Sequence, residues 1–403
     1  MASFAGLRGT GSFGTDERPQ DFREMILWTN PNGTAPLFAL SAKMKKEVCN
    51  DPQIHWWEET NDIGRSTVDG AIADGVDTTI TVDAAVGESG GALQYAPGDL
   101  LLVEEDVAAY TTEILEVVSV TNDTDLVVIR GAAGSTAAAF SDAIGLLRIG
   151  SNHEEGSGSP ATVTKNPTKL TNFTQIFKTP YQLTRTAENT TFRTGDPLKN
   201  DQIRKSFVHS EKIEQALFWG MASEVTGGGG QPKRTMAGLR SLVTSNVTVF
   251  TIDPTIDTFI AALSPVFDFE AGNAGDQRII YAGNGAINFL NKLIAGDSST
   301  RINYDGIIKM YGQNLRQFTI PQGSFAIKSH PLLNTHPLFT YSMFVVNPSG
   351  LIYRPLKSSD TKIQKNIQLP DEDLRKDQWL TECTFEVHYE RSFAFISGFK
   401  DWP

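Results

Sequence analysis

The feature that most constrains the fold is a long helical pattern in the middle of the chain. Asp196 suits a helix N-cap, and Pro197 suits the first helical position because the missing N–H would be unpaired there in any case. The pattern predicts a helix of about 25 residues, roughly 37 Å long, ending before a run of glycines. Glu214 falls on its apolar face and needs a partner or an opening to water. At 100° per residue that face contains Ile203, Phe207, Ile213, Leu217, Phe218 and Met221.

Composition indicates an ordered globular chain. Its 403 residues are 40% hydrophobic, which suffices for two or three cores. No stretch approaches 18 consecutive apolar residues, and the N-terminus lacks the charged start and apolar run of a signal peptide. We therefore expect cytosolic synthesis and no membrane partner. The net charge of −12 argues against a dedicated nucleic-acid binder, but it does not exclude a container whose inner wall faces DNA without binding it tightly.

The chain before the helix starts with a segment that suits an arm. Residues 1–54 are rich in turn-forming residues, with one short amphipathic piece at 21–28 (DFREMILW). Such interrupted apolar residues favour an arm laid over a neighbour rather than an independent core. HWWEETND, at 55–62, then predicts the start of a strand with two large aromatic residues.

A β-rich region follows the arm. Residues 65–160 contain short β-type runs between turns, as in a small sandwich or barrel, and end in a Gly/Ser/Pro-rich linker. We interpret them as an inserted β domain. The extended segment 171–183 is expected to pair with the strand begun at His55. Residues 55–64 and 161–196 would then form one long hairpin with the β domain at its tip.

Two further regions are expected beyond the helix. The glycines at 227–230 lack the G-x-x-x-x-G-K-[ST] pattern of a phosphate-binding loop, so they predict a flexible loop. Asp253-Pro254 repeats the cap-plus-proline helix start, and residues 253–354 predict a compact α/β unit. Two strands near the C-terminus, TKIQKNIQL and the long WLTECTFEVHYERSFAFISGF, would close a second region around the long helix. That region combines residues 197–252 and 355–403.

No residue pattern predicts catalysis, a cofactor or a metal site. Of the six histidines only His330 and His336 are near each other, in a proline-containing loop that does not suit a metal site. Paired acids of the kind used by glycosidases are more often simply solvated in loops. These are Glu58/Glu59, Glu154/Glu155 and Asp371/Glu372/Asp373. Cys49 and Cys383 are far apart and predict two reduced thiols. We expect a protein that is not an enzyme.

The order of arm, hairpin, long helix, α/β unit and terminal β ribbon resembles the major capsid proteins of tailed bacteriophages with the Hong Kong 97-type fold. The similarity is to a family with a β insertion in the extended loop. It is carried by NPNGTAPLFALSAKMKK (30–46), HWWEETND, TNFTQIFKTPYQLTRTAE (171–188), HSEKIEQALFWG (209–220) and TMAGL (235–239). The chain departs from the family at HWWEETND, where a single tryptophan before an acidic hairpin is expected. It also has no helical scaffolding segment ahead of the arm, which suggests a separate scaffold protein or a processed precursor.

The resemblance implies an α+β fold whose 197–252 and 355–403 regions form a peripheral domain with a spine helix and whose 253–354 region forms an axial domain. It implies hexamers and pentamers in an icosahedral shell, assembled in the host cytoplasm and found in the virion. Expected partners are a scaffold protein, a portal, decoration proteins and packaged double-stranded DNA contacted non-specifically. Because buried aromatics dominate interface energies, apolar residues of the arm and hairpin are candidate intersubunit anchors. They are Phe38, Leu40, Trp56, Trp57, Phe173 and Phe177.

Two other interpretations stay open at this point. An encapsulin-like cellular nanocompartment shares the fold, and only a portal and terminase in the neighbouring genes would separate it from a virus shell. A tail-associated carbohydrate-binding protein or hydrolase would also suit the turn-rich β segment and the scattered aromatics. That protein would be a discrete monomer or trimer, whereas a shell forms particles of megadalton size.

Overall fold

The computed structural model describes residues 35, 38, 45–59, 64–84, 91–104, 113–159, 164, 166–192, 195–268, 277–296, 304–310 and 313–399. The chain divides into two compact units. One unit is Trp56–Leu170, and the other joins the chain up to His55 with everything from Thr171 onward. Each unit has its own buried apolar cluster or clusters, so each is described by itself.

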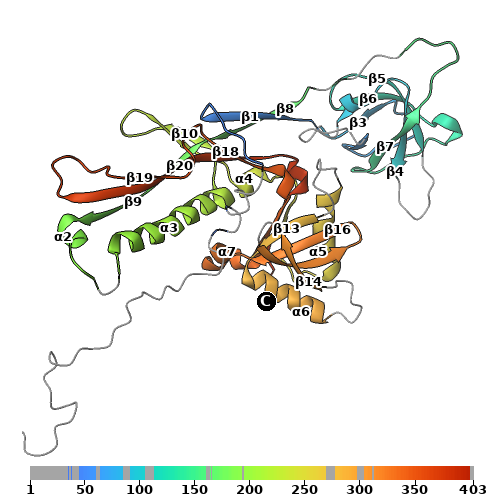
Figure 1. Ribbon diagram of the computed structural model, residues 1–403. Coiled ribbons are helices and arrows are strands. Elements are labelled where there is room, and N and C mark those ends of the chain that lie inside the picture. Colours follow the sequence, from blue (N-terminus) through green and yellow to red (C-terminus); the bar gives the residue numbers. More distant parts are fainter. Residues whose placement is uncertain are drawn as a thin grey trace, which may run out of the picture. The chain divides into compact units, whose positions relative to one another are not determined.

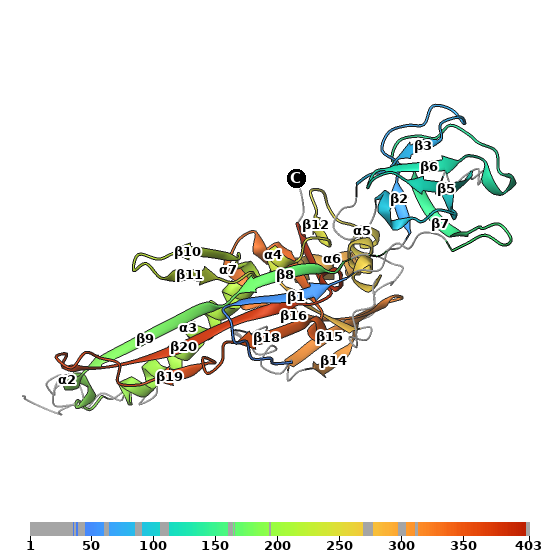
Figure 2. The same ribbon diagram turned by 90° about the horizontal axis from the view of Figure 1, so that it is seen from above.

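The expected long helix is present as α3, Pro197–Trp219. Asp196 caps it as predicted, since its carboxylate accepts hydrogen bonds from the backbone N–H groups of Leu198 (2.9 Å) and Lys199 (3.4 Å). The helix ends at Gly220, whose N–H donates to the Ala216 carbonyl. It lies along β9 (Gln175–Thr184) and β20 (Leu374–Val387), as both ribbon views show (Figures 1 and 2).

The predicted long hairpin is shorter in the structure. In the structure β1 (Gln53–Glu58) pairs only with β8 (Thr168–Phe173), whereas β9 pairs antiparallel with β20 along its whole length. Alternate β9 residues, Phe177, Thr179 and Tyr181, are buried. Side chains of a strand alternate between its two faces, so these residues lie on one face of β9, which packs against α3. Strand β9 is therefore part of a covered sheet and not of a projecting hairpin. A short helix, α2 (Arg185–Glu188), follows β9.

The sheet beneath α3 has four strands. Strand β20 pairs β9, β18 (Leu351–Pro355) and β19 (Lys362–Gln364). We predicted β18 in the 253–354 unit, and this is wrong. Strand β18 pairs antiparallel with β20 from Leu351 to Pro355, so the backbone hydrogen bonds between the two strands place it in this sheet.

A mixed seven-stranded sheet forms the second half of this unit, in the order β12-β21-β17-β13-β16-β15-β14. Its central strands come from the predicted α/β unit. The bounds are β12 (Val247–Val249), β13 (Gln277–Ala282), β14 (Tyr304–Met310), β15 (Gln313–Ile320), β16 (Gly323–Ser329), β17 (Ser342–Val346) and β21 (Ala394–Ser397). Helices α5 (Ile256–Leu263), α6 (Asn284–Gly296) and α7 (Pro331–Thr335) accompany it.

Two boundaries of this sheet differ from the predictions. The segment 379–399 is two strands rather than one, because Tyr389 adopts a left-handed conformation (φ 58°) and starts a turn before β21. Strands β12 and β21 extend the seven-stranded sheet instead of joining the sheet around α3, since Ala394 and Ile396 are buried in its core. Helix α5 is capped by Thr255, through a reciprocal pair with Thr258, and not by Asp253.

The glycine-rich stretch after α3 is the tip of a β-hairpin rather than a flexible loop. Strands β10 (Ser223–Thr226) and β11 (Pro232–Thr235) pair antiparallel, and the Gly227 N–H closes the turn on the Gln231 carbonyl at 2.8 Å. Gly230 has φ 76°, a conformation that favours glycine. The short helix α4 (Leu239–Leu242) follows.

The unit Trp56–Leu170 contains a six-stranded antiparallel sheet in the order β2-β7-β4-β5-β6-β3. All the predicted β-type runs of this region are strands. They are β3 (Thr79–Thr81), β4 (Asp99–Glu104), β5 (Ile114–Val120), β6 (Asp125–Ile129) and β7 (Gly145–Ser151), and β2 (Arg65–Thr67) is a further strand that was not predicted. Their alternate apolar residues, such as Ile80, Leu101, Leu115 and Leu126, form one core. Among the described helices of the whole chain, none is long and apolar enough to span a membrane.

A buried ion pair organises one end of this sheet. The Arg130 Nε and Nη2 atoms each lie 2.7 Å from a Glu113 carboxylate oxygen, and both side chains are at most 5% exposed. The same carboxylate accepts N–H groups from Gly131 and Ala138. These hydrogen bonds hold the pKa of Glu113 below its usual value although burial opposes the charge.

We therefore predict that Glu113→Ala destabilises this unit by about 3–5 kcal/mol, because it leaves a buried guanidinium without its counter-ion. Hydrogen exchange should accelerate in β4 to β7 and stay unchanged in α3. Glu154→Ala, at an exposed position, is the control. Unchanged exchange in the Glu113 variant would contradict the role given to the pair.

Candidate assembly interface

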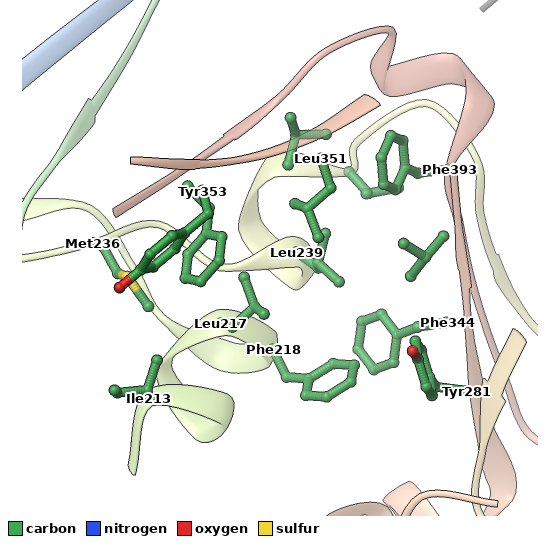
Figure 3. Close-up of a cluster of buried hydrophobic side chains, with 14 of the residues drawn as sticks. Ile213, Leu217, Phe218, Met236, Leu239, Tyr281, Phe344, Leu351, Tyr353 and Phe393 are labelled. Atoms are coloured by element: carbon green, nitrogen blue, oxygen red, sulfur yellow. The ribbon is translucent and has the colours of Figure 1, made fainter. Parts of the chain in front are cut away.

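Side chains from β18 and from the seven-stranded sheet pack around the C-terminal half of α3. Ile213, Leu217 and Phe218 are fully buried in a cluster that also draws on the seven-stranded sheet and on β18. The ring centroid of Phe218 lies 4.9 Å from that of Phe344 and 6.4 Å from that of Tyr281. Figure 3 shows these three side chains close together. These aromatic contacts attach the helix to the sheet and so hold the two halves of the unit together.

Glu214, the carboxylate expected to need a partner, has two. Its side chain is completely buried, and Oε1 lies 2.7 Å from Nε2 of His330. The His330 Nδ1 accepts the N–H of Leu332 at 3.2 Å, so Nε2 carries the ring hydrogen and donates it to Glu214. The other carboxylate oxygen accepts the backbone N–H of Phe38 at 2.5 Å. The predicted need for a partner is confirmed.

We call Glu214, His330 and Phe38 the carboxylate joint. It connects the spine helix to the start of α7 and to the arm, three segments that are far apart in the chain. Rings of Phe218 (4.8 Å) and Tyr281 (5.7 Å) stand edge-on to the imidazole and exclude water from the joint. In such surroundings a hydrogen bond is strong, and losing its partner is costly.

A second buried polar residue joins two of the motifs that carry the family resemblance. Asn172, in TNFTQIF, accepts the N–H of Ala237, in TMAGL, at 2.7 Å and donates to the Phe385 carbonyl of β20 at 2.9 Å. Next to it the chain passes very close to the end of α3. A Cβ on Gly238 would lie 2.6 Å from the Ala216 carbonyl oxygen, so only glycine fits there.

His209 connects the middle of α3 to strands β9 and β20. It is 1% exposed and lies 3.1 Å from the Thr179 hydroxyl of β9 and 2.7 Å from the Thr381 hydroxyl of β20. The Trp379 ring lies beside it, with centroids 6.4 Å apart. Burial, assisted by the charge of Lys212, lowers the pKa of His209 to about 4.

The six candidate anchors differ in how far the structure exposes them. Phe177 is 6% exposed and Phe38 is half-buried, and both pack on the cluster around α3 of their own chain. Phe173 is also half-buried. Trp56 is buried, whereas Trp57 is 63% exposed, because neighbouring strand residues point to opposite faces. Leu40 lies outside the described residues. Trp57 is therefore the candidate with the most surface left to offer a neighbour.

The predicted apolar face of α3 is covered only in part. Ile203 is 43% exposed, Phe207 40% and Met221 74%, so these three residues of the predicted apolar face are not buried. Helical periodicity gives the face on which a residue lies but not how far the packing partners extend along it. The partners reach Ile213, Leu217 and Phe218.

The side chains considered for chemistry have structural roles or lie at the surface. His330 belongs to the carboxylate joint, and His336 accepts the Leu338 N–H at 3.1 Å. Asp373 pairs with Arg185 at 2.9 Å, and Glu154 and Glu155 are exposed. Cys49 and Cys383 are both buried and unlinked. Within the described ranges, no three His, Cys, Asp or Glu side chains are grouped as metal ligands would be.

The carboxylate joint generates a stability prediction. Glu214→Ala leaves a cavity and removes the acceptor of both the His330 and the Phe38 donors, so we expect a loss of about 3–5 kcal/mol in the free energy of unfolding. Glu211→Ala, one turn earlier on the same helix and partly exposed, should change it by less than about 0.5 kcal/mol. Urea denaturation of the unassembled subunit measures both, and equal effects would contradict the joint's role.

His209 generates a pH prediction. Its native pKa of about 4 lies below the ordinary 6.5, so between these values the unfolded chain binds a proton that the native chain does not. Stability present above pH 6.5 is thus lost as the pH falls towards 4, by up to about 3 kcal/mol for this group. We expect His209→Asn to be less stable at pH 7 but to lose less on acidification. His153→Asn, at an exposed position, should keep the wild-type pH dependence in urea denaturation.

Comparisons with known proteins address the family directly. A family model described as SU10 major capsid protein matches residues 7–400. The "Major capsid protein" of Pseudomonas phage PaMx41 is 26% identical over 350 residues, which cover 83% of this chain and 78% of the relative.

Solved structures are also similar, at low identity. Mycobacterium phage Adephagia aligns with 8% identity and a TM-score of 0.47, over 96% of this chain and 97% of the other. Microbacterium phage Oxtober96 aligns with 12% identity and a TM-score of 0.44, over 95% and 96%. The family assignment rests on the sequence match, which decides against the cellular nanocompartment and the tail-associated hydrolase. Because the family model spans nearly the whole chain, the chain belongs to the SU10 major capsid protein family: it is a phage major capsid protein with an α+β fold, a structural component of the virion head shell and not an enzyme.

Proposed function

We propose that copies of this chain form the hexamers and pentamers of an icosahedral shell, and that Trp57 of the extended loop is an anchor between neighbouring subunits. The observation that carries the proposal is the 63% exposure of Trp57 beside a tryptophan that is buried. Rings of identical subunits require heterologous interfaces, in which a projecting segment of one copy is received by a different surface of the next.

The sheet that carries Trp57 supports this role. Strands β1 and β8 form a sheet of two strands, and two-stranded sheets are at best marginally stable in water without further packing. A neighbour that covered the exposed indole would supply that packing. Large aromatics in such positions dominate interface energies.

The unit Trp56–Leu170 is proposed to be an insertion in the extended loop. Strands β1 and β8 are the chain's way into and out of this unit, as expected for a domain placed within a hairpin. The remaining assignments are residues 1–54 as the arm, the sheet around α3 as the peripheral domain and the seven-stranded sheet as the axial domain. The sequence predicted that residues 161–196 form the second strand of the hairpin, and in this proposal only β8 does.

Partners follow from the role of a container. The net charge of −12 suits a wall that contacts packaged double-stranded DNA without specific binding. A scaffold protein, a portal and decoration proteins are the further proposed partners, and assembly is proposed to take place in the host cytoplasm. Negative-stain microscopy and light scattering of the purified chain test the central claim. Megadalton shells are expected, and a discrete monomer or trimer under all conditions would contradict it.

Trp57 provides the sharper test. Trp57→Ser removes an exposed side chain, so the subunit should fold with unchanged stability, within about 0.5 kcal/mol, but the yield of shells should fall at least about tenfold. Val76→Ser, which removes another strongly exposed apolar side chain, is the matched control. Size-exclusion chromatography with light scattering gives the yield, and normal shells from the Trp57 variant would refute the anchor.

A further inference from the structure

The first half of α3 presents two large apolar side chains at its surface. Ile203 and Phe207 are 43% and 40% exposed, and they lie one turn apart on one side of the helix. We call this pair the spine strip. The helical line that contains it continues to Glu214 and Leu217, which are buried beneath the arm residue Phe38, α7 and the seven-stranded sheet. The strip therefore lies on the same face of α3 as the buried residues Glu214 and Leu217, nearer the N-terminus of the helix.

The arm is anchored close to the spine strip. The Phe38 N–H is bound to Glu214, and Phe207 lies seven residues earlier on the helix, or about 10 Å along its axis. Thirty-seven residues precede Phe38 in the chain. From Ile26 to Phe38 an extended chain can span up to about 40 Å. The arm's own amphipathic piece, residues 21–28, therefore lies well within reach of the strip.

The chemistry of the two partners is complementary. Residues 21–28 place Phe22 and Ile26 four apart, the same spacing as Ile203 and Phe207 on α3. On the helix the strip is bordered by two exposed cations, Lys199 and Arg204, and by one partly exposed acid, Glu211. The arm piece supplies two acids, Asp21 and Glu24, against one arginine. An apolar pair with opposite charge on its flanks is what a docking helix needs.

Because residues 21–28 are tethered to Phe38, the segment that covers the spine strip is expected to come from the same chain rather than from a neighbour. A linker of about ten residues holds the piece at a local concentration on the order of millimolar, far above that of free subunits before assembly. We propose that residues 21–28 dock on the spine strip of their own chain in the unassembled subunit, covering Ile203 and Phe207. The docked piece shields apolar surface that would otherwise promote premature association.

Disulfide trapping tests this contact. In the double variant Ile26→Cys with Ile203→Cys, two thiols placed together lose two protons and two electrons to added diamide and form one S–S bond. The reaction is run on the full chain at a concentration at which light scattering shows monomers. We expect an intrachain bond between positions 26 and 203, identified by peptide mapping. The native Cys49 and Cys383 are buried and remain in place.

A matched variant separates docking from mere tethering. Ile26→Cys with Gln215→Cys places the second thiol beside the Glu214 anchor but about 120° around the helix, at an exposed position. A free tether reaches both sites, so the docked arm should form the 26–203 bond at least about tenfold faster. Phe207→Ser, added to the first pair, should reduce that advantage because it removes half of the strip.

Each other outcome overturns the proposal. Equal rates for the two pairs would show an undocked arm, and bonds only between chains would assign the strip to a second copy. Circular dichroism of each variant at pH 7 checks that the helix is intact. Because Ile203, Phe207 and Gln215 are all exposed, these substitutions leave the core unchanged.

Discussion

The structure of the main unit depends on one buried carboxylate. Glu214 lies on an otherwise apolar face of the spine helix, with a side chain that no solvent reaches. Removing a carboxylate from water costs several kcal/mol unless hydrogen bonds replace the lost hydration. His330 and the Phe38 N–H supply them, from α7 and from the arm. A leucine at this position would pack as well but would not require either segment to be in one place. The cost of burying Glu214 thus favours a single arrangement of three segments.

The same principle recurs along the helix. His209 bridges hydroxyls on β9 and β20, and Asn172 ties the end of β8 to Ala237 and to β20. Aromatic packing around Phe218 buries apolar surface between the helix and the seven-stranded sheet. Apolar contacts are non-directional, so they stabilise the assembly of these elements without selecting one register. The polar contacts do select it, because each has a partner only in one register.

A shell protein also needs surface that its own fold leaves uncovered. Trp57, Ile203 and Phe207 are large, apolar and exposed. Such residues are tolerated because the functional state of the protein is an assembly, in which contacts that are weak singly are repeated over many copies. The ion pair of Glu113 and Arg130 shows that the β unit, by contrast, is stabilised internally.

Local features of the fold could be predicted from the sequence. The Asp196-Pro197 start of α3, the bounds of α6 and the strands of the β unit follow from capping, proline and periodicity, which act within a few residues. The order of these elements also carried the family resemblance, and the need of Glu214 for a partner was visible from its place on an apolar face. For the candidate site the sequence could indicate that Trp56 and Trp57 mattered together, but not which of them faces water.

Only the tertiary structure decided which segments meet. The pairing of β9 with β20, across about 190 residues of chain, depends on hydrogen bonds that either strand could also have made with other partners. Burial of Phe218 but not of Phe207 depends on where the seven-stranded sheet ends, a property of the partner and not of the helix. The identity of Glu214's partners was equally hidden, since His330 and Phe38 lie 116 and 176 residues away. The sequence therefore determined the local conformation, whereas long-range packing determined the sheet partners and the surface left for assembly.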